Sequence, residues 1–120
     1  MVRGIRGATT VGSNTAEEIR EATIELLQAI VKENNLSEED IVSAIFTVTS
    51  DLNADFPASS ARAIGWDRVP LLCSTEIPVP GSMPLCIRVL LQVNSDKSQL
   101  EISHVYLRKA VGLRQDLAAQ

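Results

Sequence analysis

A mixed β-sheet with helices packed on one of its faces, an α+β fold, is the architecture that this sequence predicts. The apolar residues make up 45% of the chain and are mainly Ile, Val, Leu and Ala, which suit a sheet packed against helices. The expected elements follow in the order β-α-β-α-β-β-β, which indicates a sheet of mixed direction. Because 120 residues fit one domain, we expect residues 1–120 to form a single domain, with roughly residues 115–120 as a flexible C-terminal tail.

The first expected elements are a strand over residues 2–8 and a helix over residues 16–33. Glycines bracket part of the strand and mark a place where another group can approach the backbone. Thr15 and Glu18 fit a capping box that opens the helix. Apolar residues recur at helical spacing and would face the core: Ile19, Ala22, Leu26, Leu27, Ile30 and Val31.

The remaining elements are a short helix and four strands. Pro57 suits the first turn of the helix, which extends to about Ile64, and Gly65 ends it. The strands are apolar runs or alternating segments between turn residues: 43–49, 69–74, 85–93 and 101–107. Two helices are too few to cover both faces of such a sheet, so we expect self-association into a homo-oligomer.

Composition excludes several classes of function. The net charge is −4 and no run of Lys and Arg occurs, which argues against nucleic-acid binding. No apolar run reaches the ~20 residues of a membrane span, and no signal peptide follows Met1, so we expect a cytoplasmic protein with reduced thiols. Two cysteines and one histidine are too few for a zinc site of Cys and His ligands.

Sequence motifs for nucleotide cradling and for a serine nucleophile are also missing. What remains is a set of arginines with one glutamate, one tyrosine and one cysteine. Such a set suits the binding of a small polyanion and the stabilisation of charge, rather than metal or covalent chemistry.

Arg88 is the most informative of these residues, because it interrupts an almost wholly apolar strand. A charge in that position must pair, reach water or meet a ligand. An arginine that reaches solvent at a strand edge, or that forms an internal ion pair, is as good an interpretation from the strand alone as a functional one.

The other candidates are weaker when each is taken alone. Arg6 lies beside Gly7 on the first strand, although a surface arginine is the simpler interpretation. Glu76 follows a strand at a junction where functional side chains collect, yet most such glutamates are only solvated. Tyr106 would be a core tyrosine with a satisfied hydroxyl, and Phe56 would be core.

Four segments together resemble the monofunctional, trimeric chorismate mutases of the AroH class along nearly the whole chain. Their order and spacing match as well as their residues: RGIRGATTV at 3–11, SDLNADFPA at 50–58, VPLLCSTEIPVPGSMPLCIRVLL at 69–91 and HVYLRKAVGLRQDL at 104–117. The resemblance implies a homotrimer that forms a pseudo-α/β-barrel, with active sites at the subunit interfaces. It also implies the rearrangement of chorismate to prephenate, a step in phenylalanine and tyrosine biosynthesis, without cofactor or metal.

The resemblance implies a role for each candidate in the pocket. Arg6 and Tyr106 would contact substrate carboxylates, and Arg88 would hydrogen-bond the ether oxygen and the adjoining carboxylate region. Glu76 would bind the ring hydroxyl, with Cys73 beside it.

Further substrate-binding residues would close the pocket. The resemblance places three of them on the neighbouring subunit: Phe56, Ala58 and Arg62. Leu113 and Arg114 would lie near the mouth. The sequence departs from the family at Ser59, where Lys is common, and at Gln115, where Pro is common.

Two other functions fit the same inventory. One is a deaminase-like enzyme on a similar trimeric architecture, which would also anchor a carboxylate with Arg. The other is a trimeric module that binds a small anion without catalysis. The segment RGIRGATT and the C-x-x-E spacing of Cys73 and Glu76 favour the mutase over the deaminase, and measuring the loss of chorismate would separate all three.

Overall fold

The computed structural model describes residues 1–113, and its centre is a five-stranded sheet in the order β3-β2-β4-β1-β5. The strands are β1 (Val2–Thr10), β2 (Ile41–Val48), β3 (Leu71–Thr75), β4 (Cys86–Asn94) and β5 (Val105–Tyr106). β4 is antiparallel to both of its neighbours, whereas the outer strands β5 and β3 run parallel to β1 and β2. The tail expected at 115–120 lies outside the described residues.

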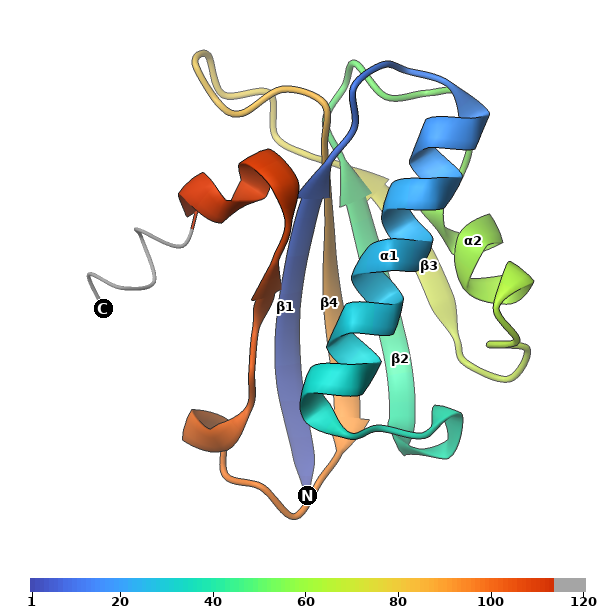
Figure 1. Ribbon diagram of the computed structural model, residues 1–120, viewed down its shortest axis with the longest axis vertical. Helices are drawn as coiled ribbons and strands as arrows, with labels where there is room; N and C mark the ends of the chain where they lie inside the picture. The colour runs from blue at the N-terminus through green and yellow to red at the C-terminus, as the bar shows by residue number, and fades with distance from the viewer. Residues whose placement is uncertain (114–120) are drawn as a thin grey trace.

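Both α-helices, α1 (Ala16–Asn34) and α2 (Pro57–Ala63), pack on the same face of this sheet. α1 crosses the middle of the sheet and α2 lies beside it toward β3 (Figure 1). Three short 3₁₀ turns complete the chain: η1 (Glu38–Asp40), η2 (Gln99–Glu101) and η3 (Arg108–Leu113). The prediction of a mixed sheet with helices on one face is therefore confirmed.

α1 begins and ends close to where the sequence predicts. Thr15 Oγ1 accepts a hydrogen bond from the Glu18 N–H at 3.1 Å, which is one half of the expected capping box. The other half differs, because the Glu18 carboxylate accepts from the Ser13 N–H and hydroxyl instead of from Thr15. Asn35 ends the helix in the left-handed conformation, with φ of 52°.

Strand alternation divides the sheet into a covered face and an open face. On β4, Ile87, Val89, Leu91 and Val93 are buried beneath the helices. Arg88 and Leu90 lie between them and therefore belong to the open face. Gly7 lets α1 approach β1 closely, since a Cβ there would lie 2.6 Å from Ile30 Cδ1.

The strand expected at 101–107 is much shorter in the structure and covers only 105–106. The preceding segment forms η2, which Ser98 and Glu101 close with reciprocal hydrogen bonds. The Gln99 side chain donates to the Gly4 carbonyl and accepts from the Gly4 N–H, at 2.7 and 3.0 Å. This side-chain pair replaces a main-chain ladder along that part of β1, which explains why the alternation at 101–104 does not produce a strand.

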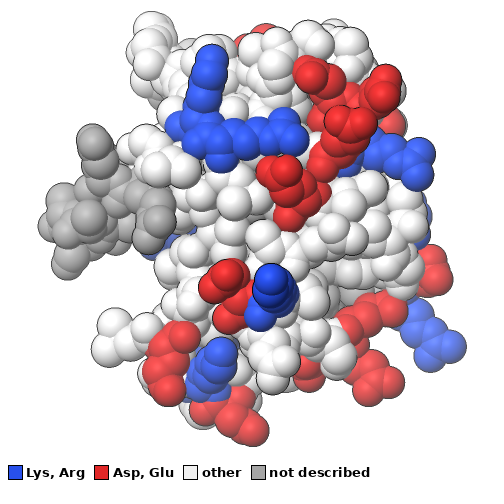
Figure 2. All heavy atoms as spheres, viewed as in Figure 1, with Lys and Arg blue, Asp and Glu red and all other residues white. Residues whose placement is uncertain are grey.

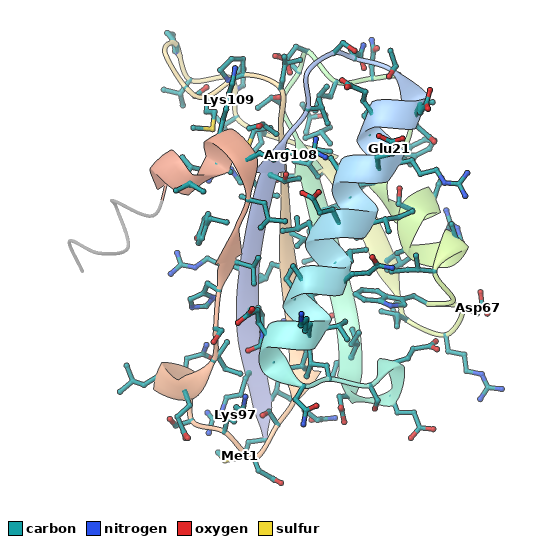
Figure 3. All side chains as sticks on the ribbon, in the orientation of Figure 1. Met1, Glu21, Asp67, Lys97, Arg108 and Lys109 are labelled. Atoms are coloured by element: carbon teal, nitrogen blue, oxygen red, sulfur yellow. The ribbon has the colours of Figure 1, made fainter. Side chains whose placement is uncertain are left out.

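The end of the described chain is fastened to the helix layer. Arg108 Nε lies 3.3 Å from Glu25 Oε1 on α1, and Arg108 Nη1 donates to the Thr10 carbonyl at 3.2 Å. Figure 3 labels Arg108 between β1 and α1. Acidic and basic side chains are interspersed over this face of the molecule (Figure 2). No helix within residues 1–113 is long and apolar enough to cross a membrane.

Candidate active site

Four residues of the open face lie in one row across the sheet. Tyr106 on β5 is in register with Ala8 on β1, and Ala8 is in register with Arg88 on β4. Arg88 is in turn opposite Thr47 on β2. Because residues in register share a face, their side chains all project away from the helices.

A pocket of about 330 Å³ lies over this row. Its size falls within the range of small-molecule sites. It is lined by Arg6, Gly7, Ala8, Ile45, Thr47, Arg88, Val89, Leu90 and Tyr106. Ala8 forms the floor between Tyr106 and Arg88, and its short side chain leaves space that a larger one would fill.

Arg88, Glu76 and Thr47 form a polar cluster at one side of the pocket. Arg88 Nε lies 3.0 Å from Glu76 Oε1, and the same oxygen accepts a hydrogen bond from Thr47 Oγ1 at 2.6 Å. The Glu76 N–H also donates to the Val48 carbonyl at 2.8 Å, which fixes the backbone at the end of β3. Neither side-chain contact uses Glu76 Oε2.

The Arg88 guanidinium is paired but not satisfied. Its side chain is 43% exposed, yet Nε itself is buried and its N–H is not directed at the Glu76 oxygen, so the pair is an ion contact without a hydrogen bond. Within residues 1–113 this N–H has no acceptor. Since 43% of the side chain is exposed where it lines the pocket, a ligand oxygen would meet the accessible part of this guanidinium and not the buried Nε.

Arg6 and Tyr106 stand at the other side of the pocket. Arg6 is exposed on β1, where its residue partner across the ladder is Leu90, and Tyr106 is half-buried on β5. The backbone N–H of Arg6 donates a hydrogen bond to Nδ1 of His104 at 2.9 Å. Burial and the neighbouring Arg6 charge lower the pKa of His104, which keeps the imidazole neutral.

Four of the predicted site residues thus converge: Arg6, Arg88 and Tyr106 line the pocket, and Glu76 contacts Arg88 at its edge. Cys73 does not join them, because it is in register with Phe46 and packs with the core on the covered face.

The residues expected from a neighbouring subunit also lie away from the pocket of their own chain. Phe56 precedes α2 and is 66% exposed, Ala58 is buried in the main core, and Arg62 is exposed on α2. Since α2 packs on the covered face, none of the three can reach the open face of the same chain. Leu113 is half-buried at the end of η3, and Arg114 lies outside the described residues.

Sequence reasoning missed Thr47 and Ala8. Both are common residue types on strands, and nothing in their identity indicates a site. Their position could be found only by combining the alternation of β1 and β2 with the register of both strands against β4.

The cluster suits binding and charge stabilisation. Two guanidiniums and a phenol can hold an anion with two carboxylates. Within residues 1–113 no group of three or more His, Cys, Asp or Glu side chains is placed to hold a metal ion.

Comparisons with known proteins identify the family of the chain. A family model described as chorismate mutase type I matches residues 2–117. The chorismate mutase AroH of Thermus thermophilus is 55% identical over 98% of this chain and 97% of its own, and that of Bacillus subtilis is 48% identical over 98% and 94%. A solved chorismate mutase from Clostridium thermocellum is 53% identical, with a TM-score of 0.90 over 91% of this chain and 97% of its own.

Proposed function

The chain belongs to the type I chorismate mutases, and we propose that the pocket on the open face of its sheet is where it rearranges chorismate to prephenate. The observation that carries this assignment is the Arg88 side chain, which is paired with Glu76, 43% exposed, and lines one pocket together with Arg6 and Tyr106. The deaminase and the non-catalytic anion module have no comparable support in the family, whose relatives are named as mutases.

The reaction is a concerted rearrangement in which a C–O bond breaks as a C–C bond forms. Breaking of the C–O bond runs ahead, so the ether oxygen gains partial negative charge in the transition state. No proton donor, base or nucleophile is needed. The protein must hold the folded conformer of the substrate and place a fixed cation at that oxygen.

Arg88 fits the second requirement. Guanidinium stays charged at neutral pH and offers directed donors. Arg88 is held in place before the substrate arrives by its ion contact with Glu76. Glu76 is held in turn by the hydrogen bond from the Thr47 hydroxyl. Because the guanidinium is already held by Glu76 and partly desolvated, little reorganisation would be required when charge develops on the oxygen.

The remaining residues fit the first requirement. Arg6 and Tyr106 lie where they can bind the carboxylates at the far side of the pocket. Glu76 Oε2 can accept a hydrogen bond from the ring hydroxyl. Contacts on both sides of the floor at Ala8 would bring the two reacting carbons together.

Substitution of Arg88 tests the proposal. Arg88→Ala should lower kcat by at least about 10²–10³-fold while the protein stays folded, and Arg88→Lys should recover only part of the activity because the fork of donors is lost. Arg68→Ala, which removes an exposed guanidinium beside Glu38 and Asp67, is the matched control and should keep full activity. Wild-type turnover by Arg88→Ala, measured as ultraviolet loss of chorismate, would exclude Arg88 from the mechanism.

We also propose that the protein acts as a homotrimer with shared sites. Leu72 beside the pocket, with Leu90 and Ile45 in its lining, leave 62, 39 and 37% of their surface exposed on the open face, an apolar area at the pocket's border that a second copy would cover. Phe56 and Arg62 cannot reach the pocket of their own chain, so a neighbouring copy would supply them.

Mixing two inactive variants tests the sharing of sites. Arg88→Ala and Arg62→Ala copies, unfolded and refolded together, should form mixed trimers in which some sites combine an intact Arg88 with an intact Arg62. Such mixtures should recover part of the wild-type activity, whereas each variant refolded alone should not. A mixture no more active than its components, or a monomeric mass by light scattering, would contradict the shared site.

A further inference from the structure

The single imidazole of the chain links the two carboxylate-binding residues of the proposed site. His104 Nδ1 accepts a hydrogen bond from the Arg6 N–H at 2.9 Å, and His104 precedes β5, which carries Tyr106 two residues later. Arg6 and Tyr106 both line the pocket. The His104 side chain therefore contacts β1, which carries Arg6, and belongs to the segment that leads into Tyr106.

β5 depends on such side-chain contacts because it is only two residues long. Strands this short contribute little stability of their own. On its N-terminal side, Asn34 of α1 donates to the Ser103 carbonyl and accepts from the Ser103 N–H, both at 2.9 Å. On its C-terminal side, the Leu107 N–H donates to the Ala8 carbonyl at 2.9 Å. The hydrogen bond of His104 to the Arg6 backbone lies between the contacts at Ser103 and Leu107 and ties this segment to β1.

The hydrogen bond requires a free lone pair on Nδ1. An N–H donates to it, so the imidazole must be neutral with its proton on Nε2. Protonation of Nδ1 would turn two donors toward each other and break the tether. The charged group that acts on the imidazole is the Arg6 guanidinium, which opposes protonation together with burial.

We propose that His104 is a positioning residue that, as a neutral imidazole, holds the Arg6 backbone and the start of β5 so that Arg6 and Tyr106 face one substrate. This inference rests on the proposed function. Arg6 and Tyr106 would bind carboxylates that the substrate and the transition state share, so loss of the tether should raise KM more than it lowers kcat. His104→Leu should raise KM by about tenfold, the usual effect of one lost hydrogen bond.

Gln99→Leu is the matched control. Gln99 tethers the same edge of β1 through two hydrogen bonds to Gly4, which does not line the pocket. If His104 only strengthens this edge, Gln99→Leu should raise KM as much as His104→Leu does. If His104 positions the site, Gln99→Leu should lower the melting temperature and leave KM unchanged.

His104→Asn adds a test through pH. Asn can offer an oxygen acceptor that does not titrate, so this variant should keep a near-wild-type KM. Because this is the only histidine of the chain, ¹⁵N NMR reports its tautomer and pKa without ambiguity. In the wild type, KM should rise with falling pH at the midpoint that NMR gives for His104, and in His104→Asn this rise should vanish.

The outcomes separate the two proposals. An Nδ1–H tautomer, an unchanged KM in His104→Leu, or the same acid rise of KM in His104→Asn would overturn the role of His104 and leave the mutase assignment intact. Failure of the wild type to consume chorismate would instead overturn the assignment of function. If His104→Leu does not fold, the tautomer and the comparison of wild type with His104→Asn still decide the matter.

Discussion

Thr47 should support catalysis through Glu76, although nothing in the amino-acid sequence around Thr47 indicates a functional role. Its hydroxyl donates to Glu76 Oε1 at 2.6 Å, a length typical of a charge-assisted hydrogen bond. Thr47→Val removes that donor and keeps the shape of the side chain. Glu76 should then move more freely, and both its contact with Arg88 and its proposed contact with the substrate hydroxyl should weaken.

The magnitude follows from the chemistry of this contact. A hydrogen bond to a charged group contributes about 1.5–3 kcal/mol. The Glu76 side chain keeps 26% of its surface exposed, so water replaces part of the lost interaction and the lower end of the range applies. Because about 1.4 kcal/mol corresponds to a factor of ten, kcat/KM for chorismate should fall about tenfold.

A double-mutant cycle tests the route of the effect. If Thr47 acts through Glu76, then Thr47→Val in a Glu76→Gln background should cost much less than it does in the wild type. Thr75→Val is the control, since it makes the same change at an exposed position of β3 and should leave kcat/KM unaltered. Full activity of Thr47→Val, or strictly additive effects with Glu76→Gln, would refute this reasoning.

Three further predictions concern stability and reactivity. Gly7→Ala should lower the free energy of unfolding by about 1–3 kcal/mol in urea titrations, because the new Cβ would lie 2.6 Å from Ile30 Cδ1 and 3.1 Å from Val89 Cγ1, on side chains that are themselves buried; an unchanged midpoint would show that these side chains repack without cost. Burial raises the pKa of the Cys86 thiol, so Cys86 should resist alkylation near pH ~8 until the protein unfolds, as mass spectrometry of modified peptides can show. The pKa of His104 is lowered from 6.5 in the folded protein, so just below pH 6.5 the unfolded chain binds a proton at His104 more readily than the folded chain does. The free energy of unfolding should therefore fall as pH drops below 6.5, and this part of the dependence should be missing in His104→Asn.

Local signals made most of the fold predictable. The cap at Thr15 and the left-handed residue at the end of α1 lie where polar residues flank an apolar stripe, and Gly65 ends α2 with φ of 94°. Where the prediction failed, at residues 101–104, the ladder was replaced by a long-range side-chain contact from Gln99. Alternation along one segment cannot reveal that its hydrogen-bonding partner is a side chain.

The site was predictable for residues whose chemistry conflicts with their surroundings. Arg88 is conspicuous because a charge interrupts an apolar strand, and the structure places it in the pocket instead of leaving it wholly in solvent. Thr47 and Ala8 cause no such conflict, so their roles depend on register alone. Cys73 lies close to Glu76 in sequence but on the other face of β3, a separation that the C-x-x-E spacing does not convey.

The register of the sheet also explains why a site and an interface can share one open face. The row through Tyr106, Ala8, Arg88 and Thr47 carries polar groups that, in the proposed site, would meet a substrate. Two residues away along the strands, a second row includes Leu90, Ile45 and Leu72, which are apolar and exposed at the end toward β3. Leu90 and Ile45 also line the pocket, so a copy that covers this apolar end would border the pocket and could close it with groups from its α2. In the proposed trimer, the two-residue period of the strands would thus set ligand and partner next to each other, so that loss of the assembly should remove activity even where every polar group of the pocket is intact.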